Sequence, residues 1–128
     1  MKDMLQETEK LSELAVNLGE LLSSHNGIDV VVMDMRPLDF WTDFFVIATV
    51  TSNTHLSGLE RHIKDFSGET GLEIRRRSKK GDIDDEWSLI DMGSIVIHLM
   101  NIRARSFYEL ERLWSSAPLI YSHSSKSS

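Results

Sequence analysis

The stretch Glu86–Met100, EWSLIDMGSIVIHLM, contains two short apolar runs that meet at Met92–Gly93. Apolar runs on either side of a glycine-containing pair predict a β-hairpin with a two-residue turn. This pairing puts Trp87 directly opposite His98, with Asp91 on the same face. Because strand residues rise about 3.3 Å each, it leaves Asp91 about 13 Å from His98, whereas an orienting His–Asp bond needs about 3 Å. The hairpin is therefore predicted not to hold an Asp–His catalytic pair.

Apolar residues at helical spacing predict two helices upstream of the hairpin. A leucine stripe predicts a helix over residues 3–24, ending at "HNG" with Gly27 as a left-handed cap. A second stripe predicts a helix that begins near residues 51–53 and ends at Gly71. The apolar face of this second helix consists of Leu56, Leu59, Ile63 and Phe66.

The remaining segments predict strands and one more helix. Asp29–Met35 and Asp43–Thr51 are apolar throughout, which is typical of buried strands. Residues 72–78, LEIRRRS, predict an edge strand, because charge there discourages pairing with other molecules. Ser106 and Glu109 have the spacing of a capping box and predict a helix starting at that serine. The expected buried face of this last helix is Phe107, Leu110, Leu113 and Trp114.

The order of these elements predicts an α/β fold with a mixed sheet of about five strands flanked by helices. We expect one domain over residues 1–115. Residues 116–128 are rich in serine and are expected to form a tail that is partly disordered.

Composition narrows the possible functions. Without cysteine, the chain can form neither disulfides nor thiolate sites. No apolar run approaches the roughly twenty residues of a membrane-spanning helix, and the N-terminus lacks the pattern of a targeting signal. These features predict a cytoplasmic protein. The net charge is −6, and the run RRRSKK (75–80) holds five of the fourteen cations, leaving nine cations against twenty acids elsewhere. Such an acidic body suits a basic partner or simply keeps the protein in solution.

Known catalytic and metal-binding patterns are weak in this sequence. Asp82 and Asp84 could be the paired metal ligands of a nucleotidyltransferase, but they lie in a charged loop without an upstream Gly-Ser motif. His55 and His62 are two helical turns apart, about 10 Å, which is too far for one zinc ion. The sequence therefore predicts no metal, no cofactor and no small-molecule substrate. The run 75–80 leaves direct RNA binding open as an alternative.

Four segments in order are similar to one known family: DVVVMDM, TDFFVIATVTSNTH, EWSLIDMGSIVIHLM and RSFYELERLW. Together they resemble the ribosomal silencing factors, also called Iojap-like proteins, over roughly residues 11–114. The resemblance implies a fold related to nucleotidyltransferases but without their catalytic motif. One departure is the long charged loop RRRSKKGDIDDE before Trp87, where the family usually has a short one.

The resemblance also implies a function, which is to repress translation rather than catalyse a reaction. Members of this family bind protein fourteen of the large ribosomal subunit and block joining with the small subunit. The residues implied in partner binding are Trp87, Asp91, His98, Arg105, Tyr108 and Glu111. We expect a monomer or weak homodimer, with possible contact to ribosomal RNA. The alternatives are a nucleotidyltransferase-related enzyme and an RNA-binding module that uses the run 75–80.

Overall fold

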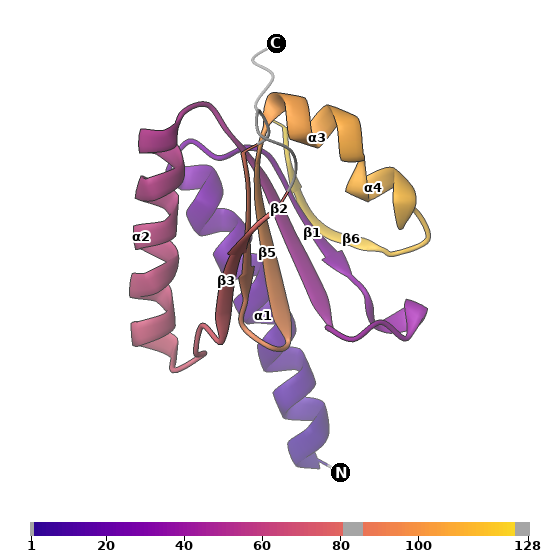
Figure 1. Ribbon diagram of the computed structural model, residues 1–128. Coiled ribbons are helices and arrows are strands. Elements are labelled where there is room, and N and C mark those ends of the chain that lie inside the picture. The colour runs from indigo at the N-terminus through magenta and orange to yellow at the C-terminus, as the bar shows by residue number, and fades with distance from the viewer. Residues whose placement is uncertain (1, 81–85, 125–128) are drawn as a thin grey trace.

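The computed structural model describes residues 2–80 and 86–124. It is an α/β fold built on one six-stranded mixed sheet, in the order β3-β4-β5-β2-β1-β6 (Figure 1). Strands β2 and β5 are parallel and the other neighbours are antiparallel. The predicted fold class is thus confirmed, with one strand more than expected. The strands are β1 Ile28–Asp34, β2 Phe44–Val50, β3 Arg76–Lys79, β4 Trp87–Asp91, β5 Ile95–Asn101 and β6 Leu119–His123.

Helices cover the two faces of the sheet unequally. The long helices α1 (Lys2–Ser24) and α2 (Asn53–Thr70) lie against one face. The short helices α3 (Ile102–Tyr108) and α4 (Leu110–Leu113) lie on the other side, near one end of the sheet (Figure 1). A 3₁₀ turn, η1 (Arg36–Leu38), connects β1 to β2. Only part of the second face is therefore covered by helix.

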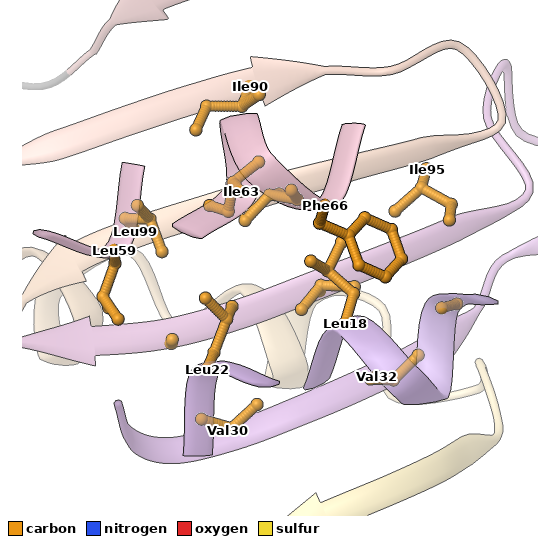
Figure 2. Packing of buried hydrophobic residues seen from close by; sticks show 14 of the residues in the cluster. Leu18, Leu22, Val30, Val32, Leu59, Ile63, Phe66, Ile90, Ile95 and Leu99 are labelled. Atoms are coloured by element: carbon orange, nitrogen blue, oxygen red, sulfur yellow. The ribbon is translucent and has the colours of Figure 1, made fainter. Parts of the chain in front are cut away.

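Successive side chains of the central strands point to opposite faces of the sheet, so each face has its own core. Every residue of β2 is buried, and its odd and even positions belong to different cores. The larger core lies between the sheet and the two long helices, as Figure 2 shows for Leu18, Ile63 and Leu99. The smaller core, under α3 and α4, is rich in sulfur and aromatic rings and includes Met33, Phe45 and Met100.

The turn of the β4–β5 hairpin differs from the prediction by one residue. Gly93 and Ser94 form the turn, and the Met92 N–H donates to the Ile95 carbonyl at 2.9 Å. Gly93 has φ +84°, and the turns that join hairpin strands require such a value at their first position. Glycine adopts it without strain, whereas Met92, which the predicted turn placed there, would not.

The corrected turn moves every cross-strand partner by two positions. Trp87 now lies opposite Met100, and His98 lies opposite Leu89, so the predicted direct pairing of Trp87 with His98 is wrong. The side-chain period of a strand is two, so a shift of two positions keeps each residue on its predicted face. The predicted distance of about 13 Å between Asp91 and His98 depended on that pairing, so it no longer applies.

The C-terminal segment is more ordered than expected. Residues 119–123, which were assigned to the tail, form β6 and pair with β1. The Tyr121 hydroxyl also donates to Ser23 Oγ of α1 at 3.0 Å. The sequence reading missed this strand because the surrounding serines dominate the composition, while the apolar run is short. The final residues of the expected tail lie outside the described part of the chain.

Two helix boundaries also differ from the prediction. Helix α3 begins directly after β5, with the Asn101 side chain accepting from the Ala104 N–H at 2.8 Å, so Ser106 is inside the helix and the capping box is wrong. Glu109 adopts a left-handed conformation, φ 44°, and separates α3 from α4. At the end of α1, Asn26 takes the positive φ expected for Gly27. The predicted caps of α2 are confirmed, with Ser52 at its start and Gly71 at its end.

Candidate docking surface

Trp87 and His98 form the polar centre of the second face. Trp87 Nε1 donates a hydrogen bond to His98 Nδ1 at 3.1 Å, a diagonal contact across β4 and β5. An accepting Nδ1 carries no proton, so the neutral imidazole carries its proton on Nε2. Within the described residues, His98 Nε2 has no hydrogen-bond partner. The predicted proximity of these two rings is thus observed, although by a different pairing.

Burial keeps His98 neutral. The ring is 4% exposed and packs edge-on against Phe45, with ring centroids 4.6 Å apart. Burial, and secondarily the charge of Arg105, lower the pKa of His98 to about 3. The Asp91 carboxylate accepts instead from the Gly93 N–H at 2.7 Å. His98 therefore lies beneath the surface, where its ring accepts the hydrogen bond of Trp87.

A strip of aromatic and apolar side chains continues outward from Trp87. The Tyr108 ring lies 4.6 Å from the Trp87 ring, and the Phe107 ring lies 4.9 Å from Tyr108. Phe107 is 72% exposed, whereas the sequence predicted it in the core. The prediction assumed one helix with Phe107 and Leu110 on the same face, but the break at Glu109 separates these two residues, and Ala104 is the buried residue of α3.

The strip also runs along β4 toward the hairpin turn. Leu89 and Asp91 follow Trp87 at alternate positions, share its face and are half-buried. Asp91 and Trp41 line one open hollow of about 310 Å³ beside the turn, and Trp41 is 63% exposed. The sequence did not single out Trp41, because this residue lies in a connection between two predicted strands. The name "β4 strip" is used below for Trp41, Trp87, Leu89, Asp91, Phe107 and Tyr108.

Arg105 and Glu111 form a separate group that holds the short helices. Arg105 donates two hydrogen bonds to the Glu111 carboxylate, at 2.8 and 2.9 Å, across the break between α3 and α4. It also donates to Thr49 Oγ1 of β2 at 2.9 Å and to the Asp29 carbonyl of β1 at 2.7 Å. The Arg105 side chain is only 12% exposed. Of the six predicted site residues, this pair braces the helices, while Trp87, Tyr108 and Asp91 line the β4 strip.

The other candidate groups are more scattered. His62 stacks on His25, with centroids 3.5 Å apart, and His55 Nε2 lies 3.2 Å from the His25 carbonyl. Nowhere in residues 2–80 and 86–124 do acids, histidines or cysteines gather as a metal site would need. The same residues contain no helix long and apolar enough to cross a membrane. Asp82 and Asp84, the acids of the nucleotidyltransferase alternative, lie outside the described residues.

An α/β domain that presents large aromatic rings and one carboxylate on a partly uncovered sheet face has the features of a protein-binding module. Comparison with known proteins gives the family. The profile described as "Ribosomal silencing factor during starvation" matches residues 8–128. The chain therefore belongs to the ribosomal silencing factor family, whose members regulate translation and bind ribosomes.

Individual relatives agree with this assignment. The chain is 38% identical to "Ribosomal silencing factor RsfS" of Treponema pallidum over 97 residues, covering 76% of this chain and 86% of that protein. It is 33% identical to the protein of the same name from Bacillus subtilis over 91 residues, covering 71% and 75%. A crystal structure of a Chromobacterium violaceum protein matches with a TM-score of 0.68 and 28% identity, covering 94% of this chain and 89% of that one.

Proposed function

We propose that this ribosomal silencing factor represses translation by binding protein fourteen of the large ribosomal subunit through the β4 strip. The bound domain then blocks the small subunit sterically. The observation that carries the proposal is the continuity of the strip, from exposed Phe107 through Tyr108 and Trp87 to Asp91 at the turn. Exposed aromatic rings that neighbour one another are typical anchors of protein interfaces.

The charge of the chain supports a basic partner. Outside residues 75–80 the sequence holds twenty acids and nine cations. Proteins that bind ribosomal RNA are basic for electrostatic reasons, so one of them would meet a complementary surface here. Asp91 is the acid within the strip, and its backbone bond to Gly93 holds the carboxylate at one end of the aromatic row.

The mechanism requires occupancy and no chemical step. His98 has a buried, neutral ring and is engaged by Trp87, so it is poorly suited to proton transfer with a substrate. We accordingly propose a regulator that is not an enzyme and that acts in the cytoplasm as a monomer or weak homodimer. Its effect would depend on concentration, because each bound copy removes one large subunit from joining.

Binding of purified protein fourteen tests which surface is used. Phe107→Ala should weaken binding by about 1–3 kcal/mol, since it removes an exposed anchor. Ile102→Ala is the matched control, because Ile102 is 63% exposed on the same helix but is not part of the strip. Asp91→Asn keeps an oxygen for the Gly93 N–H and removes the charge, so it should lower mainly the association rate at low salt. Equal binding by the wild type and Phe107→Ala would overturn this assignment of the surface.

A further inference from the structure

The sheet edge next to the β4 strip carries a cluster of positive charge. Within the described residues, strand β3 lies at the end of the sheet and pairs with β4 alone. All five cations of the run 75–80 are exposed: Arg75, Arg76, Arg77, Lys79 and Lys80. We propose that this edge binds the phosphate backbone of ribosomal RNA while the β4 strip binds its protein partner. The inference rests on the proposed function, since the strip brings the edge to the ribosome.

Strand pairing places these cations on both sides of the edge. Arg76 lies opposite Asp91, so it is on the face of the β4 strip. Arg77 lies opposite Ile90 and Lys79 opposite Ser88, on the face that α2 covers. Residues two apart on a strand are about 6.6 Å from each other. The edge therefore presents cations on both faces of the sheet, and Arg76 is the one that continues the face of the β4 strip.

Among the described residues, one ion pair involves these cations. The Arg77 guanidinium is 3.6 Å from the Glu60 carboxylate, and the arginine side chain is 62% exposed. The pair is long and its arginine is exposed to solvent, so it contributes little. Glu60 is also occupied, because it accepts from Ser88 Oγ at 2.9 Å. A phosphate can therefore bind Arg77 without breaking a strong interaction.

Charge complementarity favours RNA bound beside a basic protein. The acids of the body and the single acid of the strip, Asp91, favour a positive partner, whereas the cations of the β3 edge favour a negative one. A ribosomal protein embedded in RNA presents both charges side by side, and phosphate contacts by arginine and lysine require no base sequence. An acidic protein would complement the edge but would be repelled by the acidic body of the chain.

The test compares two targets across a range of salt concentrations. The variant Arg76→Gln/Arg77→Gln/Lys79→Gln leaves Arg75 in place, because its guanidinium packs close to the turn at Gly93. The matched control, Lys10→Gln/Arg61→Gln/Lys64→Gln, removes three exposed cations from the helices and the same total charge. Affinity is measured for large ribosomal subunits and for isolated protein fourteen, from 50 to 200 mM salt.

In a plot of log affinity against log salt, three phosphate contacts contribute about −2 to the slope. The slope of the wild type should therefore be steeper than that of the β3 variant by about 2. On large subunits, the wild type should lose about 20-fold more affinity than the β3 variant between these salt concentrations. The control should keep the wild-type slope on subunits, and the two variants, which carry the same total charge, should bind isolated protein fourteen equally. Equal slopes for wild type and β3 variant on subunits would overturn the RNA contact. A loss by the β3 variant on isolated protein fourteen would instead assign the edge to protein. Failure of the wild type to bind protein fourteen at all would refute the proposed function, a result distinct from both.

Discussion

Acidification should destabilise this domain through His98. In the folded protein, burial lowers the pKa of His98 to about 3, against 6.5 for the unperturbed group. Between these two values the unfolded chain binds a proton that the folded chain does not, so folding stability falls as the pH falls. The neutral ring makes its full contribution to folding stability above about pH 6.5, and this contribution is lost progressively as the pH falls toward 3.

The size of the effect follows from the difference between the two pKa values. Each pH unit below the unfolded pKa costs about 1.4 kcal/mol, so about 2 kcal/mol is lost between pH 7 and pH 5. A typical domain has only about 5–15 kcal/mol of stability, so the loss is large. Protonating Nδ1 would also replace the acceptor of the Trp87 N–H with a donor. The orientation of Trp87 should therefore be affected together with stability.

Urea denaturation at pH 7, 6 and 5 measures the effect. His98→Gln keeps an oxygen acceptor for Trp87 and removes the titrating group. The stability difference between wild type and His98→Gln should change by about 2 kcal/mol from pH 7 to pH 5, in the direction that disfavours the wild type. His123→Gln is the control, because His123 is exposed, and it should follow the wild type. Parallel pH profiles for wild type and His98→Gln would refute the reasoning.

Four further substitutions test the packing by urea denaturation. Gly19→Ala should destabilise by about 1–3 kcal/mol, because its methyl group would lie 2.7 Å from Val32 Cγ2. Gly58→Ala, with open space around it, should instead stabilise by roughly 0.5–1 kcal/mol, and equal effects would contradict this packing. Trp114→Ala should cost about 3 kcal/mol, the low end for aromatic truncation, because the half-buried ring packs into the second core; a neutral result would place the ring in solvent. Arg105→Gln should cost about 1.5–3 kcal/mol by removing charged hydrogen bonds, and an unchanged midpoint would show that the brace is dispensable.

The sequence predicted the elements with strong periodicity. The stripe from Leu56 to Phe66 lies in α2, with all four of its apolar residues buried. The face of Trp87 and His98 was also correct, because a two-position shift preserves strand alternation. Even with a wrong turn, the prediction therefore assigned these residues to the correct face of the sheet.

Competition between local signals explains the errors. Ser106 and Glu109 have good capping spacing, but Asn101 caps the helix earlier, where β5 ends. That difference brings Arg105 into the helix, against Glu111. The break at Glu109 leaves Phe107 exposed. Such choices depend on where a preceding strand leaves the sheet, which is a tertiary fact. The exposed part of the site was therefore harder to predict than its buried part.

Subunit joining tests the central claim most directly. Purified large subunits are incubated with the protein at saturating concentration, small subunits are added, and joined ribosomes are separated by sedimentation. We predict that the wild type lowers the joined fraction in proportion to its occupancy of the large subunit. Phe107→Ala should require a higher concentration for the same effect, and Ile102→Ala should not. A joined fraction that is unchanged while the wild-type protein sediments with the large subunit would contradict the account.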